Sequence, residues 1–153
     1  MFKHLLVPLD GSALAESAID YARQITQPGA TITLLTAVDV PEYAITTFYA
    51  GGVLSEPARQ SSTTEHMLPH AREYLNAISN KLEEAGWKVR VETVVGDAAH
   101  TIIDTAVNEN IDTIVMSTHG RSGINRWLFG SVTQKVLAAA PCPVLVIPNI
   151  KRD

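Results

Sequence analysis

Three glycines stand between residues 117 and 133, a segment that reads S-T-H-G-R-S-G-I-N-R-W-L-F-G-S-V-T. They are Gly120, Gly123 and Gly130, and Ser131 follows the last of them. Glycine allows a ligand to approach the backbone closely, because it has no Cβ. A helix that begins at Ser131 would also direct free N–H groups and the positive end of its dipole toward that ligand. The pattern therefore favours an anion site, and phosphate is the usual anion.

These glycines alone do not decide between a phosphate site and an ordinary turn before a helix. A P-loop has the pattern G-x-x-x-x-G-K-[ST], but Ser131 rather than a lysine follows Gly130. The dinucleotide fingerprint G-x-G-x-x-G is also absent, both here and after the first predicted strand. The chain lacks the G-x-S-x-G turn of a Ser-His-Asp hydrolase and the S-G-G-x-D-S loop of adenylating enzymes as well. A phosphate site in this segment would therefore need another type of loop.

The residues on either side of the glycines predict a strand that leads into them and a helix that follows. Residues 113–116 form a short apolar run, which is typical of a buried strand. After Ser131, apolar residues recur with helical spacing at Val132, Val136, Leu137 and Ala140. The glycine segment would then connect the carboxyl end of a strand to the N-terminus of a helix.

The same alternation of strand and helix patterns continues along the whole chain. Apolar segments predict five strands, at residues 5–9, 30–38, 88–95, 112–117 and 144–147. Apolar stripes predict helices that include residues 14–25, 75–85, 102–107 and 132–140. The expected N-caps are Ser12 and Asp97, and the expected stops are Pro28-Gly29, Gly86 and Pro141. We therefore predict an α/β fold, a Rossmann-like open sheet of five parallel strands with helices on both faces.

The first and fourth predicted strands meet where a sheet of this kind binds ligands. Open parallel sheets bind ligands outside the carboxyl ends of their strands, at the point where the strand order reverses. If the first strand is central, its end at residues 8–10 lies beside the end of the fourth strand at Met116 and Ser117. Asp10 is suited to accept a hydrogen bond from a ribose hydroxyl. A turn or cap residue is an equally good interpretation of Asp10.

Residues 39–63 show no regular periodicity, and two prolines and two glycines interrupt them. A loop of this length is uncommon in a compact domain. It could be a lid over the ligand or a disordered insertion, and the sequence leaves both open.

His66 and His70 are four residues apart, which is the spacing of two metal ligands on one helix face. Further ligands are limited to Glu65 and Glu73, and Pro69 disturbs the helix between the histidines. Structural metal sites need four ligands, so we expect no metal site here.

Length and composition describe a globular protein of one domain, residues 1–153, with 46% hydrophobic and 18% charged residues. The net charge of −4 disfavours binding to nucleic acid, which normally requires a basic surface. Cys142 is the single cysteine, so no intrachain disulfide can form, which fits a reducing cytosol. No run approaches the ~18 apolar residues of a membrane span, so we expect no contact with the membrane.

Several segments, in this order and spacing, resemble the universal stress protein family. They are Pro8-Leu9-Asp10-Gly11-Ser12, Val38-Asp39, Val95-Gly96-Asp97, Met116 through Thr133 and Pro141-Cys142-Pro143-Val144-Leu145-Val146. The likeness extends over essentially the whole chain. ATP-binding members of the family have the pattern G-x2-G-x9-G-[ST], and Gly120, Gly130 and Ser131 match its later positions. Ser117 replaces its first glycine.

The resemblance implies a sheet in the order 3-2-1-4-5, a homodimer and a bound ATP, which we expect to be accompanied by Mg²⁺. It implies that Asp10 holds the ribose, that Val38 lines the adenine pocket and that the loop around Gly120 and Gly130 holds the phosphates. The expected nucleotide-binding residues are Pro8, Leu9, Asp10, Val38, Met116, Ser117, His119, Gly120, Arg121, Gly123, Gly130, Ser131, Val132 and Thr133.

The resemblance predicts an ATP-binding regulatory module of the stress response in the cytoplasm. Because Ser117 replaces a motif glycine, a dimeric interaction protein that binds no nucleotide is the alternative. A slow ATPase is a third hypothesis, for which His119, Arg121 and Arg126 are close in sequence to the phosphate loop. The last predicted strand, residues 144–147, would be an apolar edge that invites pairing with a second copy or another protein partner.

Overall fold

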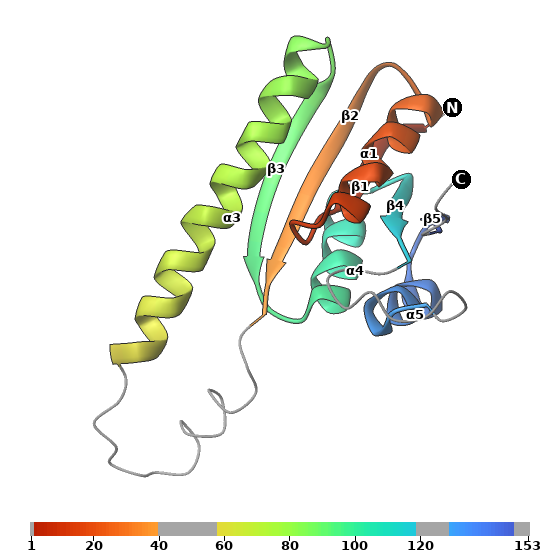
Figure 1. The fold of residues 1–153 in the computed structure, drawn as a ribbon. Helices are drawn as coiled ribbons and strands as arrows, with labels where there is room; N and C mark the ends of the chain where they lie inside the picture. Colours follow the sequence, from red (N-terminus) through yellow and green to blue (C-terminus); the bar gives the residue numbers. More distant parts are fainter. Residues whose placement is uncertain (1, 40–57, 119–128, 149–153) are drawn as a thin grey trace, which may run out of the picture.

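The computed structural model describes residues 2–39, 58–118 and 129–148. Its helices and strands alternate along the chain, as predicted (Figure 1). The elements are β1 (Phe2–Pro8), α1 (Ala13–Ile25), β2 (Thr26–Val38), α3 (Ala58–Glu84), β3 (Lys88–Val95), α4 (Ala98–Asn108), β4 (Thr113–Ser117), α5 (Ser131–Ala139) and β5 (Val144–Ile147).

The five strands form one parallel sheet in the order β3-β2-β1-β4-β5, which confirms the predicted order. β1 is the central strand, and its Leu5 is in register with Ile32 of β2 and with Thr113 of β4. The chain passes from β1 outward to β2 and β3, and then crosses back to β4 and β5. The strand order therefore reverses between β1 and β4, where sheets of this type bind ligands.

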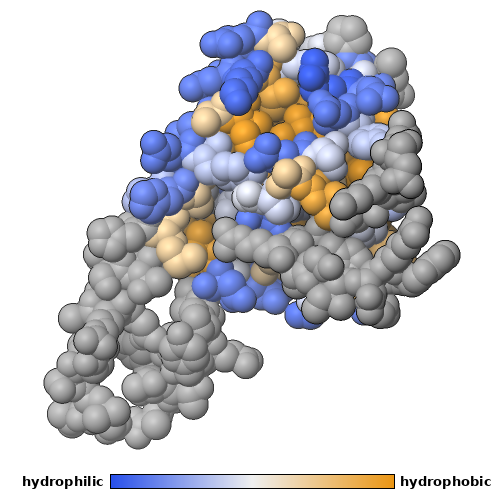
Figure 2. All heavy atoms as spheres, in the orientation of Figure 1, coloured by the Kyte–Doolittle hydropathy of each residue, from blue (hydrophilic) through white to orange (hydrophobic). Residues whose placement is uncertain are grey.

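Helices cover both faces of the sheet, as the near-continuous apolar runs of its strands require (Figure 1). Successive residues of a strand point to opposite faces, so Leu5 and Val7 pack under α1 and α3 while Leu6 packs under α4 and α5. Between α1 and α3 the core is only partly covered, and apolar residues are visible at the surface there (Figure 2). No described helix is both long and apolar enough to cross a membrane.

The boundary between α1 and β2 differs from the prediction that Pro28-Gly29 ends the helix. The helix ends at Ile25, and β2 begins at Thr26 and runs through Pro28. Proline disfavours the helical conformation of the residue before it, so Gln27 is extended and the helix must end earlier. The Thr26 hydroxyl donates to the carbonyl of Arg23 over 2.9 Å and closes the last turn.

The helix α3 is longer at its start than the predicted helical stripe. It begins at Ala58, so residues 58–63 belong to the helix and not to the predicted loop. Residues 40–57, the rest of that loop, lie outside the described residues. At the other end, Gly86 has a φ of +90°, and the N–H of Trp87 donates to the carbonyl of Leu82 over 3.0 Å. This Schellman arrangement confirms Gly86 as the stop and leaves Ala85 exposed, outside the buried stripe where we had placed it.

Two apolar residues that were expected in the buried stripes of the later helices are exposed instead. Val107 of α4 is 55% exposed and Leu137 of α5 is 43% exposed. Their preceding neighbours, Ala106 and Val136, are the residues that face the core. Consecutive positions on a helix point about 100° apart, so Val107 and Leu137 lie at the outer edge of the buried stripe of each helix.

Candidate functional site

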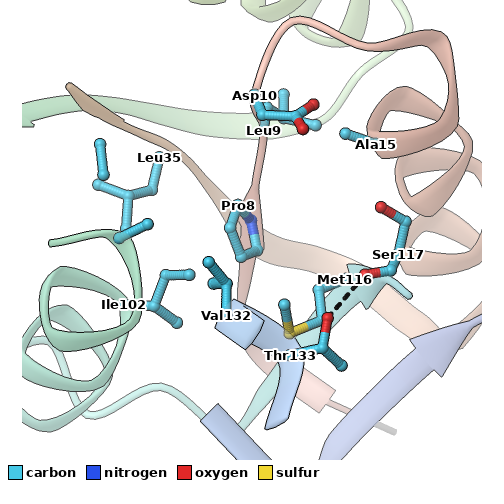
Figure 3. Close-up of a pocket in the computed structure, with 12 residues that line it drawn as sticks. Pro8, Leu9, Asp10, Ala15, Leu35, Ile102, Met116, Ser117, Val132 and Thr133 are labelled. Atoms are coloured by element: carbon cyan, nitrogen blue, oxygen red, sulfur yellow. Dashed lines mark hydrogen bonds between the residues drawn. The ribbon is translucent and has the colours of Figure 1, made fainter. Parts of the chain in front are cut away.

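A cavity of about 130 Å³ lies at the carboxyl edge of the sheet, where β1 and β4 end. Figure 3 shows side chains from several elements arranged around it. Its lining includes seven of the residues predicted to bind nucleotide, which are Pro8, Leu9, Asp10, Met116, Ser117, Val132 and Thr133. Five further lining residues were not predicted, and these are Ala15, Leu35, Ala37, Ala98 and Ile102.

Of the unpredicted lining residues, Ala15 belongs to α1, and the other four come from β2 and α4. Leu35 and Ala37 project from one face of β2, because alternate residues of a strand share a face. Val38 therefore points away from them, and it is buried without lining the cavity. Ala98 and Ile102 are four residues apart on α4 and share a helix face. Strand alternation and the Asp97 cap were the signals from which these residues could have been found.

The turn that carries Asp10 is held by hydrogen bonds within residues 10–16. Gly11 has a φ of +83°, which favours glycine at that position. The N–H of Ser12 donates to Asp10 Oδ1 over 3.0 Å, while Ser12 Oγ accepts from the N–H of Ala15 over 3.1 Å. Ser12 is thus the N-cap of α1, as predicted, and it also orients the Asp10 carboxylate. No hydrogen bond to Asp10 Oδ2 from a described residue is present.

The start of α5 lies at the same edge of the sheet. Gly130 is its N-cap, in an extended conformation with φ −60° and ψ 158°, and it contributes no side-chain hydrogen bond. Its N–H donates to the carbonyl of Thr118 over 2.9 Å. A Cβ added at Gly130 would lie 3.3 Å from that same oxygen. Close approach of two backbone segments, and not a positive φ, therefore explains the glycine.

The first turn of α5 is also fastened to the end of β4. Thr133 Oγ1 donates to the carbonyl oxygens of Ser117, over 3.3 Å, and Thr118, over 3.2 Å (Figure 3 shows the first bond). The N–H of Thr118 donates in turn to the carbonyl of Ile147 over 3.0 Å. These contacts fix the position of the helix N-terminus, whose first N–H groups have no partner within the helix. Preorganised N–H groups of this kind suit an anion.

A second helix, α4, begins next to the cavity, and an ion pair joins it to α5. Asp97 is its N-cap, as predicted, and accepts from the N–H of His100 over 2.9 Å. Lys135 Nζ of α5 lies 3.3 Å from Asp97 Oδ2. The hydrogen bond from His100, followed by Lys135, lowers the pKa of Asp97 below its usual value. Asp97 is therefore ionised at neutral pH and compensates the positive end of the α4 dipole.

The remaining predicted phosphate-binding residues cannot be placed. His119, Gly120, Arg121 and Gly123 lie outside the described residues, as does Arg126. Gly130 and Ser131 are described, and they begin α5 without lining the cavity.

The cavity is apolar, with a small number of polar groups at its edge. Asp10, Ser117 and Thr133 are the polar members of its lining. The described part of that lining contains no histidine, cysteine or lysine, the side chains most often used as nucleophile or base at neutral pH. Within the described ranges, no group of three or more His, Cys, Asp or Glu residues could hold a metal ion. This arrangement is suited to binding a ligand with a flat apolar part and a polar part.

The chain is similar to known proteins in sequence and in fold. A sequence model described as the universal stress protein family matches residues 1–148. The chain is 30% identical over 155 residues to the universal stress protein MJ0531 of Methanocaldococcus jannaschii, covering 100% of this chain and 86% of that protein. The solved structure of MJ0577, from the same organism, has a TM-score of 0.83 at 27% identity and covers 99% of both chains. A universal stress protein solved in complex with cAMP has a TM-score of 0.61 at 23% identity, covering 95% of this chain and 96% of that one, and supports the fold alone.

Proposed function

This chain belongs to the universal stress protein family, and from that premise we propose that it binds ATP as a regulatory module of the stress response. The observation that supports this most is the position of the cavity. It opens at the point where the strand order reverses, between Asp10 at the end of β1 and the N-terminus of α5. A nucleotide needs a place for a base, a ribose and a chain of phosphates. The cavity would take the base, Asp10 the ribose and the N-terminus of α5 the phosphates.

The cavity suits the base alone. Its volume of about 130 Å³ is close to that of an engineered cavity of about 150 Å³ that binds benzene. A flat ring would contact the apolar side chains of Leu35, Ile102 and Val132, which lie around the cavity (Figure 3). A complete nucleotide would not fit, so the ribose and phosphates would extend out of the cavity, past Asp10 and along the start of α5.

The two polar regions outside the cavity suit the rest of the molecule. Asp10 would accept a hydrogen bond from a ribose hydroxyl through Oδ2, because Oδ1 already accepts from Ser12. The N–H groups of Ser131 and of the residues after it would donate to phosphate oxygens. Mg²⁺ would enter with the phosphates, since this ion keeps several of its waters and needs few protein ligands when phosphates are present.

We infer that binding and not catalysis is the main activity. Hydrolysis would require a group that positions the attacking water and cations that stabilise the γ-phosphate. Among the described residues that line the cavity there is no His, Lys or Arg for this purpose, and His119 and Arg121 lie outside the described residues. A slow ATPase remains the alternative that those two residues would support. A dimeric protein without nucleotide is the alternative that Ser117 would support.

We also propose that two copies associate through β5, in the cytoplasm. β5 is an edge strand, since it pairs with β4 on one side only within the described sheet. Its Leu145 is 36% exposed, and Val144 and Val146 are half-buried. An apolar edge of this kind is stabilised when a second copy pairs with it, because both edges are satisfied at once.

Mass spectrometry of the gently purified protein under native conditions would test the nucleotide proposal. We expect each chain to carry a mass adduct that matches ATP or ADP, and the adduct to be lost from an Asp10→Ala, Ser131→Ala double variant. The isolated chain without adduct, even after incubation with ATP and Mg²⁺, would favour the interaction protein. Conversion of added ATP to ADP over hours would favour the slow ATPase.

A further inference from the structure

Tyr74 of α3 lies against the N-terminal turn of α1, at the partly covered seam between the two helices. Its hydroxyl donates to Glu16 Oε1 over 2.9 Å. Its ring packs against the core cluster that includes Ala15 and Leu75. Tyr74 therefore connects the long helix α3 to the first turn of α1, although the two are far apart in the sequence.

The same phenol also faces the turn that carries Asp10. Burial, followed by the hydrogen bond and charge of Glu16 and the charge of Asp10, raises the pKa of Tyr74 well above its ordinary value. The backbone N–H of Gly11 is close enough to the phenol oxygen to act in the opposite direction. Tyr74 thus remains a neutral donor at physiological pH and holds its hydrogen to Glu16.

Glu16 transmits this contact to Asp10 through the backbone. Its N–H donates to the carbonyl of Ser12 over 3.2 Å, and the N–H of Ser12 donates to Asp10 Oδ1 over 3.0 Å. Glu16 is therefore attached to the turn by its backbone and to α3 by its side chain. A shift of Glu16 would move Ser12, and Ser12 is the described residue that orients the Asp10 carboxylate.

We propose that Tyr74, acting through Glu16, is a positioning residue that holds Asp10 in the orientation in which it can bind the ribose of a nucleotide. This inference rests on the proposed function, and it adds a residue from α3 that does not line the cavity. A simple structural tie between α1 and α3 would stabilise the fold equally, but it would leave the Asp10 turn and the recognition of the ribose unchanged. The two possibilities are therefore separable by experiment.

Amide hydrogen exchange of Ser12, measured by NMR on the free protein, tests the positioning directly. Tyr74→Phe removes the donor hydroxyl and retains the ring, and Glu16→Met removes the acceptor oxygens while keeping a side chain of similar length. Tyr21→Phe is the control, because Tyr21 lies on α1 and is 38% exposed. We expect Ser12 exchange to be about fivefold faster in the first two variants, the equivalent of one net hydrogen bond, and unchanged in the control. A Ser12 amide that exchanges at the wild-type rate in Tyr74→Phe would overturn the proposal.

The preference for ATP over 2′,3′-dideoxy-ATP tests the consequence for recognition. We expect the wild type and Tyr21→Phe to bind ATP more tightly than 2′,3′-dideoxy-ATP. The ratio of the two dissociation constants should fall about fivefold in Tyr74→Phe. An unchanged ratio together with a lower unfolding temperature would identify Tyr74 as structural only, and would also overturn the proposal. If the wild type binds neither nucleotide, the proposed function fails, and the exchange of Ser12 still decides whether Tyr74 holds the turn.

Discussion

Replacement of Gly130 by valine should weaken ATP binding strongly while leaving the fold intact. A Cβ at this position would lie 3.3 Å from the carbonyl oxygen of Thr118, which already accepts the Gly130 N–H over 2.9 Å. An alanine at position 130 requires the neighbouring carbonyl to shift by only a few tenths of an ångström. The backbone φ of −60° at this position is also ordinary for alanine. Valine adds two methyl groups at the same place and must displace the start of α5 from the end of β4. The N–H groups that would meet the phosphates move with it.

The size of the effect follows from the hydrogen bonds that would be lost. A hydrogen bond to a charged group contributes about 1.5–3 kcal/mol, so losing one phosphate contact weakens binding at least about tenfold. Ser131→Ala removes one hydroxyl and should weaken binding about fivefold at most, equivalent to ~1 kcal/mol. Affinity for ATP is therefore expected to fall in the order wild type, Ser131→Ala, Gly130→Ala and Gly130→Val. The difference between the last two variants measures the effect of the branched side chain.

Calorimetric titration with ATP and Mg²⁺ measures these differences without heating the protein. Ala138→Val is a matched control, since it adds the same two methyl groups to an exposed position of the same helix. It should bind ATP as the wild type does, and circular dichroism should show that every variant is folded. A folded Gly130→Val that binds as tightly as the wild type would refute the reasoning, because ATP would then lie elsewhere.

Three further predictions concern charge, assembly and the ion pair beside the cavity. The hydrogen bond with Glu109, together with burial, raises the pKa of Glu92 to about 7, so stability should decline as the pH rises through 7. Glu92→Gln should flatten this decline in the unfolding temperature between pH 5 and pH 8, and a slope equal to that of the wild type would contradict it. Light scattering should give a mass of twice the 16.6 kDa chain, and Val146→Asp should shift this mass toward that of one chain. A wild-type monomer at micromolar concentration would contradict the proposed interface. Lys135→Met should change the unfolding free energy by less than about 1 kcal/mol, because the ion pair with Asp97 is exposed, and a larger loss would indicate a different role for this pair.

The sequence allowed the parallel sheet and the edge of the candidate site to be predicted from general rules, whereas the order of the strands followed from the resemblance to the universal stress protein family. Apolar runs separated by helical stripes require a parallel sheet, and such a sheet places Asp10 beside Ser117 once the first strand is central. The caps at Ser12 and Asp97 were predictable for a local reason, since each side chain bonds an N–H three residues later.

The parts that could not be predicted depend on how elements pack together. Strand alternation places Leu35 on the same face of β2 as Ala37, and the Asp97 cap sets the start of the helix that carries Ile102. Which of these faces meets the cavity depends on how α4 packs against β2. The exposure of Val107 likewise depends on which side of α4 meets the sheet. The role of Gly130 was open for the same reason, since its contact with Thr118 joins two segments of the chain.

Titration of the wild-type chain with ATP and Mg²⁺ tests the central proposal most directly. We expect one ATP to bind per chain, and Asp10→Asn to bind ATP more weakly. Inorganic triphosphate should bind much more weakly than ATP, because the base is expected to occupy the cavity. Absence of binding up to millimolar ATP would contradict the proposal. In that case the serine at position 117 would mark a family member that acts through its partners and not through a nucleotide.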